Sequence, residues 1–206
     1  MKVTEMQEAH IRDIGHAFGY YDYGTEKGLN SFFRSRDALA EYICGFVRCV
    51  LAGGFVHTTS ARGEAYIAYK LPGQKVGFRS TLLLLQGIRR SMSLKETFRF
   101  AKVLSAGGPS LEDLLQKQHK PCVFVGMVCV REAYQGQGYM RKVMELAYAE
   151  GNRLGVPVIL DTDAKSKCEK YQHLGMELVG VRDLGEYGKL YDLIKYPDKP
   201  TPEENA

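Results

Sequence analysis

Residues 128–140 read VCVREAYQGQGYM, an apolar run followed by a polar turn and a Gly-x-Gly that opens an amphipathic pattern. The apolar run begins at residue 122 and is nearly unbroken, which predicts a central strand buried on both faces. After the glycines, apolar residues recur at helical spacing as far as Leu154, and Gly155 ends the pattern. Glycines at a helix start leave backbone N–H groups uncovered, and the helix dipole adds positive charge there. The segment therefore predicts an anion site for a phosphorylated ligand.

The elements around this segment predict a mixed α/β fold. Residues 156–161 form another apolar run, so 122–161 is expected to be a parallel strand–helix–strand unit with a right-handed crossover. Upstream we expect a helix with a Thr4-x-x-Gln7 capping box, a second helix from Ser35 to the Gly53 stop, and a hairpin over 55–59 and 64–71. Downstream we expect a helix over 165–174 and a hairpin over 176–181 and 189–195.

Residues 76–120 form a helical insertion in this pattern. The sequences Ser93-x-x-Glu96 and Ser110-x-x-Asp113 both predict helix starts, and 107–109 (Gly-Gly-Pro) breaks the run between them. We expect 1–196 to be a single domain containing this insertion, and 197–206 to be a loose tail rich in Pro and Glu.

Composition narrows the classes of function. The net charge of +4 permits an anionic ligand but does not indicate nucleic-acid binding. The five cysteines are odd in number and lack a Cys-x-x-Cys, so we expect reduced thiols and no metal. The first residues lack a signal-peptide pattern, and the longest apolar cluster is too short to span a bilayer. These features predict a cytoplasmic protein without a nucleic-acid or membrane partner.

Two motifs resemble the GNAT superfamily of N-acetyltransferases. Residues 135–140 (QGQGYM) resemble its cofactor motif Arg/Gln-x-x-Gly-x-Gly/Ala at Gln135 and Gly138, with Met140 where Gly or Ala is usual. Residues 171–176 (YQHLGM) resemble Tyr-x-x-Leu-Gly-Phe, with Met176 for Phe. The stretch 160–171 and the insertion resemble the puromycin-type acetyltransferases most, although 165–167 (KSK) replace an Asn usual in the superfamily.

The resemblance implies the GNAT acyl-CoA acyltransferase fold, with the insertion between the family's third and fourth strands. It also implies acetyl-CoA as co-substrate and a primary amine, of a small molecule, as the acceptor that attacks directly in a ternary complex. A protein or peptide amine is the alternative acceptor. The two early helices and the insertion would then line the acceptor cleft, although the insertion's apolar residues could instead be buried or form a homodimer surface.

The resemblance also implies roles for individual residues. The pyrophosphate would bind backbone N–H groups in a cradle formed by Gln135, Gly136, Gln137, Gly138, Tyr139, Met140 and Arg141. The backbone of Val128, Cys129 and Val130 would pair with the pantetheine arm where two strands splay apart, helped by a bulge at Gly126. Arg131, Arg141 and Lys142 would add charge for the phosphates, or form a solvated basic face.

The catalytic candidates are Tyr171 and Asp161. A phenol at Tyr171 would protonate the leaving thiolate, whereas the alternative is a packed Tyr with its hydroxyl already bonded. Asp161, at the end of a strand, is the candidate general base or else a capping or loop residue. Cys129 and Cys168 fit small buried residues better than nucleophiles.

Two other classes of protein remain to be weighed. A catalytically silent acyl-CoA-binding module would keep both glycines but show no turnover. A Rossmann-type dinucleotide domain fits less well, because its third Gly position is occupied by Arg141 and too few βαβ units surround the motif.

Overall fold

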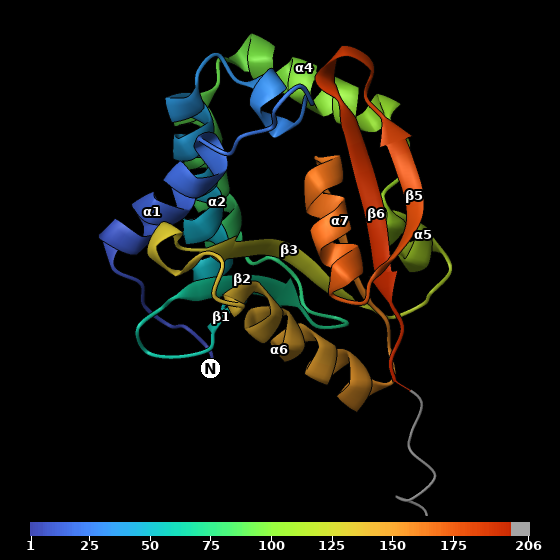
Figure 1. Ribbon diagram of the computed structural model, residues 1–206. Coiled ribbons are helices and arrows are strands. Elements are labelled where there is room, and N and C mark those ends of the chain that lie inside the picture. Colours follow the sequence, from blue (N-terminus) through green and yellow to red (C-terminus); the bar gives the residue numbers. More distant parts are fainter. Residues whose placement is uncertain (199–206) are drawn as a thin grey trace, which may run out of the picture.

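A six-stranded mixed sheet organises the chain, for which a computed structural model describes residues 1–198 (Figure 1). The strand order is β1-β2-β3-β4-β6-β5, and β3 and β4 are the one parallel pair in this sheet. The strands are β1 Val56–Thr58, β2 Ala65–Lys70, β3 Val123–Val130, β4 Val158–Thr162, β5 Glu177–Asp183 and β6 Lys189–Lys195. An isolated bridge between Lys2 and His57 adds the N-terminus to the β1 edge. The parallel unit and both predicted hairpins are confirmed.

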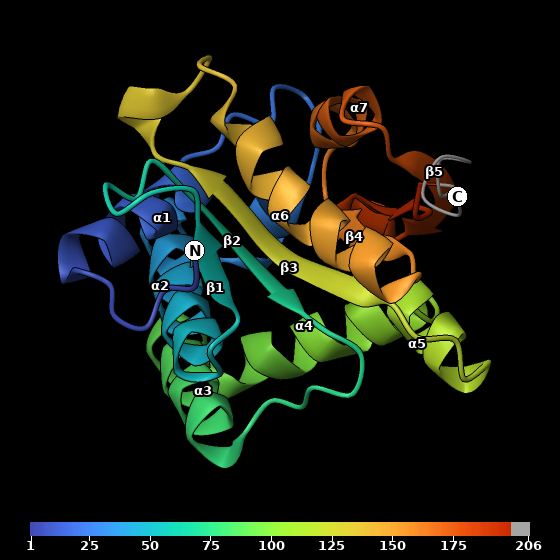
Figure 2. The same ribbon diagram turned by 90° about the horizontal axis from the view of Figure 1, so that it is seen from below.

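Within residues 1–198, seven α-helices cover the two faces of the sheet. They are α1 Glu8–Gly19, α2 Arg36–Ala52, α3 Phe78–Ser91, α4 Leu94–Ala106, α5 Leu111–Lys117, α6 Tyr139–Leu154 and α7 Lys165–His173. Figure 2 shows α6 and α7 on one side of the sheet and α1 to α4 on the other. Each side has its own apolar core, one built with α1 and α2 and the other with α6.

The helix starts show which capping signals were informative. The Ser93 and Ser110 boxes form as predicted, and each serine hydroxyl accepts a bond from the backbone N–H three residues on. The Thr4–Gln7 box is wrong, because α1 begins at Glu8 with Gln7 itself at the N-cap and without a side-chain cap. A capping box needs its serine or threonine directly before the first helical residue, and Thr4 lies too far upstream.

Strand β3 departs from the prediction of burial on both faces. Its residues alternate between buried and partly exposed, and Gly126 is exposed. The pairing with β2 skips Gly126, since Tyr69 pairs with Val125 and Ala68 with Met127. The predicted bulge is therefore confirmed. In a regular strand, residues two positions apart face the same side. Because Gly126 is an extra residue between them, Val125 faces the α6 core while Met127 faces the α1–α2 core.

The insertion is helical, as predicted, but its three helices occupy different places. Helix α3 packs closely on α2, where a Cβ added to Gly87 would lie 2.7 Å from the Cα of Gly45. Helix α4 reaches the core through Phe100, whose ring lies 4.8 Å from that of Phe32. Helix α5 is joined to the sheet by an ion pair from Lys70 to Glu112 at 2.8 Å.

Two sequence predictions concern the extent of the domain and the C-terminal tail. The extent of the domain, 1–196, stays a prediction, and most of the tail at 197–206 lies outside the described residues. Within residues 1–198, none of the helices combines the length and apolar character that crossing a membrane requires.

Candidate active site

The site begins where β3 and β4 separate. These strands pair only at Val123 with Val158 and Phe124 with Ile159, although β3 continues to Val130. Beyond Phe124, β3 keeps β2 on one edge and has no strand of residues 1–198 on the other. The sheet therefore presents a length of unpaired strand edge, as the resemblance implied for Val128, Cys129 and Val130.

A cleft of about 710 Å³ occupies this split. Because the sheet is open here, the cleft is lined from both faces. The α6–α7 side and the turn before it contribute Tyr134, Gln135, Gly136, Gly138, Tyr139, Met140, Lys167, Lys170 and Tyr171. The other side contributes Ala17, Phe18, Tyr21, Leu29, Tyr42, Ile43, Phe46, Phe100 and Leu104. Helix α4 is thus the part of the insertion that borders the cleft.

The predicted anion cradle has the geometry that such a site requires. Gly136 and Gly138 adopt left-handed backbone conformations, with φ of 73° and 76°. Gly138 is the N-cap of α6, and no side chain caps the helix. A Cβ added to either glycine would meet no atom within 4 Å, so open space lies in front of the backbone. The first N–H groups of α6 therefore lack a protein acceptor and face that space.

Two glutamine side chains stabilise the turn that precedes the cradle. The Gln135 amide donates to the carbonyl of Val130 at 3.3 Å, and the Gln137 amide donates to that of Ala133 at 3.0 Å. Their side chains thus bind the protein's own backbone, and any contact of these residues with a phosphate would come from their N–H groups.

The basic residues near the cradle differ in whether their charge is free to contact a phosphate. Arg131 is ion-paired with Asp13 at 3.0 Å, which directs its charge away from a ligand. Arg141 makes one long bond to the carbonyl of His173 at 3.4 Å, and the Lys142 ammonium lies 4.2 Å from the centre of the Tyr139 ring. Arg141 and Lys142 are both exposed beside the helix start, where they can neutralise phosphate.

Tyr171 lies in the cleft on α7, and its hydroxyl makes no hydrogen bond to any residue of the described chain. Burial is the main cause that raises its pKa above the ordinary value, followed by the nearby groups Tyr148 and Asp163. The phenol is therefore a neutral proton donor with an unused O–H. This arrangement does not fit the alternative of a tyrosine whose hydroxyl is already bonded.

Asp161 also lines the cleft, but it has a partner that the sequence did not reveal. Arg182 on β5 donates to Asp161 and, at 3.0 Å, to both oxygens of Asp192 on β6. Desolvation raises the pKa of Asp161, and the charge and hydrogen bond of Arg182 oppose that rise. The side chain of Asp161 keeps 37% of its surface exposed.

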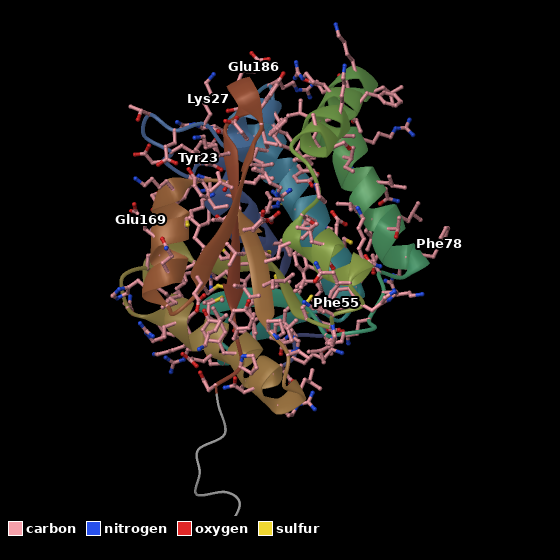
Figure 3. The ribbon with its side chains drawn as sticks, turned by 90° about the vertical axis from the view of Figure 1, so that its right-hand side faces the viewer. Tyr23, Lys27, Phe55, Phe78, Glu169 and Glu186 are labelled. Atoms are coloured by element: carbon pink, nitrogen blue, oxygen red, sulfur yellow. The ribbon has the colours of Figure 1, made fainter. Side chains whose placement is uncertain are left out.

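The structure brings a second acidic residue to the cleft that sequence reasoning missed. Asp163 accepts bonds from the Tyr23 hydroxyl at 2.6 Å, the Leu29 N–H at 2.7 Å and the Lys167 ammonium at 2.7 Å. Burial alone would raise the pKa of Asp163, but these donors outweigh it and lower the pKa. Figure 3 shows Tyr23 beside the N-terminal end of α7.

The Lys167 ammonium is enclosed by aromatic rings as well as by Asp163. It lies 4.1 Å from the centre of the Tyr21 ring and 4.7 Å from that of Tyr23. Lys167 and Tyr171 are four residues apart on α7 and therefore share one side of the helix. The sequence signal for this group is the aromatic and acidic run YYDY at 20–23.

Both cysteines near the cleft are neutral thiols. Burial raises the pKa of Cys129 to about 12, and it also raises the pKa of Cys168. Neither residue has the lowered pKa that an attacking thiolate needs. The geometry supports the interpretation of both as small buried residues.

Comparisons with known proteins agree with this architecture. Residues 104–176 match the family model described as "Acetyltransferase (GNAT) family". That segment contains the cradle, α6 and Tyr171. The search of curated proteins found no match.

Three solved structures illustrate the likeness. One is titled histone acetyltransferase HPA2 and related acetyltransferase from Corynebacterium glutamicum; it is 12% identical, with 95% of this chain and 96% of that chain covered and a TM-score of 0.54. An agmatine N-acetyltransferase in its apo form is 14% identical, with 93% and 96% covered and a TM-score of 0.52. A structure from Agrobacterium tumefaciens is 25% identical, but the match covers 36% of this chain and 56% of that one, with a TM-score of 0.34.

The near-complete coverage in the first two structures shows the common fold, and the family model matches the part of the chain that builds the cradle. Residues 104–176 are thus similar to the GNAT acetyltransferase family, and the chain shares the fold of the two acetyltransferase structures.

Proposed function

We propose that this protein transfers an acetyl group from acetyl-CoA to the primary amine of a small molecule with an apolar or aromatic body. One observation carries the proposal. A single cleft joins an uncapped N–H cradle at Gly138, an unpaired edge of β3 and the unbonded hydroxyl of Tyr171. The cradle suits the phosphates of the cofactor, the strand edge suits its extended amide-containing arm, and the hydroxyl can protonate its departing thiolate.

Different residues would bind different parts of acetyl-CoA. The N–H groups from Gly136 to Arg141 would bind the pyrophosphate, with added charge from Arg141 and Lys142. The β3 backbone at Val128 and Val130 would pair with the pantetheine arm as an added strand does. The bound thioester would then supply the acetyl group next to α7.

The chemistry follows from what Tyr171 and its neighbours can do. The acceptor amine forms a C–N bond to the acetyl carbon, the C–S bond breaks, and the Tyr171 O–H protonates the sulfur. The amine's surplus proton passes to a base, for which Asp161 is our candidate, since desolvation raises its pKa. Neutral thiols at Cys129 and Cys168 favour direct attack over a covalent enzyme intermediate.

The charge of the cleft indicates the class of acceptor. Two carboxylates line it, and both already have cationic partners: Asp161 with Arg182, and Asp163 with Lys167. The remaining cation in the lining, Lys170, has no carboxylate partner within residues 1–198. Because Asp161 shares Arg182 with Asp192, the cleft offers at most one partly compensated carboxylate to a second ammonium or guanidinium. Its far side is instead apolar and aromatic, which suits a monoamine.

A panel assay for thiol release from acetyl-CoA tests the proposal. The acceptors would be 2-phenylethylamine, tryptamine, puromycin, agmatine, spermidine and a peptide with a free N-terminus. We expect the highest kcat/KM with a monoamine that has an aromatic body. A preference for spermidine or agmatine would refute the charge argument, and a preference for the peptide would favour the protein acetyltransferase alternative.

A catalytically silent module is the remaining alternative. It would bind acetyl-CoA, seen as a rise in Tm, and release no thiol with any acceptor. The puromycin-type resemblance, a homodimer and a cytoplasmic location stay predictions.

A further inference from the structure

Helix α3 is oriented so that three of its large apolar side chains point outward. Its buried residues are small, namely Ser80, Gly87 and Ser91, and they pack on α2. Phe78 is 86% exposed, and Leu82 and Leu85 are exposed as well. These three residues follow i, i+4, i+7 spacing and share one side of the helix. Figure 3 shows Phe78 pointing away from the body of the protein.

Helix α4 continues this outward apolar surface. Leu94 and Phe98, one turn apart, are 80% and 76% exposed. They lie on the outer side of α4, whereas Phe100 and Leu104 on its inner side line the cleft. We call the exposed apolar residues of the two helices the outer face of α3–α4.

This face has an unusual concentration of positive charge around it. Residues 75–102 contain seven lysines and arginines against one acidic residue, Glu96, a net charge of +6 where the whole chain carries +4. Glu96 is used to cap α4 through Ser93. Among residues 1–198, Arg90 is the one cation of this segment with an ion-pair partner, Glu41, at 3.8 Å.

Apolar side chains flanked by unpaired lysines and arginines characterise helices that lie in a lipid–water interface. The apolar residues enter the boundary of the acyl chains, and the cations contact anionic headgroups. A second copy of this chain would bring the same positive segment against it, and this repulsion opposes self-association through that face. We propose that the outer face of α3–α4 docks on an anionic membrane surface.

This proposal revises the expectation that the protein has no membrane partner. That expectation rested on the lack of a spanning segment, and a helix that lies on a membrane needs none. Docking would also connect the membrane to the acceptor side of the cleft, because α4 contributes to both. The inference is independent of the proposed acetyltransferase reaction.

Vesicle binding measured by co-sedimentation tests the inference directly. We expect at least about tenfold more binding to phosphatidylcholine vesicles with about 30 mol% phosphatidylserine than to pure phosphatidylcholine vesicles. Raising the salt from about 0.1 M to about 0.5 M should remove most of that difference.

Two pairs of variants separate the apolar and charged contributions. Phe78→Ser with Leu82→Ser should lower binding about tenfold, while Val179→Ser with Val181→Ser, exposed on β5, should leave it unchanged. Arg79→Gln with Arg89→Gln should abolish the preference for phosphatidylserine.

Three results would overturn the proposal. The first is no binding to either kind of vesicle, and the second is binding that the Phe78 and Leu82 substitutions do not reduce. The third is a dimer of the wild type, seen by light scattering, that these same substitutions dissociate. Circular dichroism would establish that every variant is folded.

Discussion

Replacing Tyr171 by phenylalanine removes one hydroxyl and leaves the ring in the cleft. Because that hydroxyl makes no hydrogen bond to residues 1–198, the change breaks no internal bond. We expect the free energy of unfolding to change by less than about 1 kcal/mol. Acetyl-CoA affinity should also be retained, since the cradle and the β3 edge are unaltered.

Turnover should fall much further than stability. General acid catalysis contributes about 10²–10⁴-fold, so kcat should drop by that factor while the KM for acetyl-CoA stays nearly constant. The raised pKa keeps the wild-type phenol protonated throughout the neutral range and past its ordinary pKa of about 10. Ionisation of Tyr171 should therefore cause no loss of kcat between about pH 7 and about pH 9.

Tyr148 provides a matched control. It is a buried tyrosine on α6 whose hydroxyl also has no hydrogen-bond partner in the described part of the chain, and it does not line the cleft. Tyr148→Phe should leave kcat unchanged. Rates of wild type and Tyr171→Phe that agree within about twofold, or ~0.4 kcal/mol in the barrier, would show that Tyr171 only packs and that another group protonates the sulfur.

Three further outcomes are expected. In a thermal or chemical unfolding assay, acetyl-CoA at a hundredfold excess over Kd should stabilise the wild type by about 2.7 kcal/mol, and Gly138→Asp should lose this stabilisation. The control Gly155→Asp, with the same left-handed backbone at the other end of α6, should keep it. Asp163→Asn should lower the free energy of unfolding by about 3 kcal/mol at neutral pH. Because the pKa of Asp163 is lowered in the folded state, its stabilisation is present above the unfolded value of about 3.9, and urea titrations should show the difference between variant and wild type shrinking as the pH falls below about 4. Phe100→Ala should raise the KM for an aromatic amine several-fold in steady-state assays without changing that for acetyl-CoA, whereas Phe98→Ala, exposed on the same helix, should alter neither.

Local signals in the sequence predicted most of the fold. The serine boxes, the glycine stops and the apolar spacing act over a few residues, and the helices and strands follow them closely. The cradle at Gly136 and Gly138 belongs to the same class, because an uncapped glycine turn between a strand and a helix is a local feature. The Thr4–Gln7 box shows the limit of such motifs, since the same residue types recur where no helix starts.

The rest of the site depends on contacts between distant parts of the chain. Tyr23 and Asp163 are 140 positions apart, and the ion pair of Asp161 with Arg182 requires the final hairpin to fold back beside β4. Periodicity contains no information about such pairs. The choice of a general base was uncertain for the same reason, because a carboxylate's role depends on partners that only the fold supplies.

The bulge at Gly126 has a consequence in genetic terms. A missense change in β3 alters one side chain, whereas loss of one codon normally turns every later side chain of a strand over. Codon 126 is the exception, because Gly126 is the extra residue and Met127 already lies on the face opposite to Val125. Without residue 126 the alternation would be regular, and Met127 and Cys129 would still face α2 while Val128 and Val130 still face α6. In-frame deletion of this codon should therefore be tolerated better than deletion of other single codons of the strand.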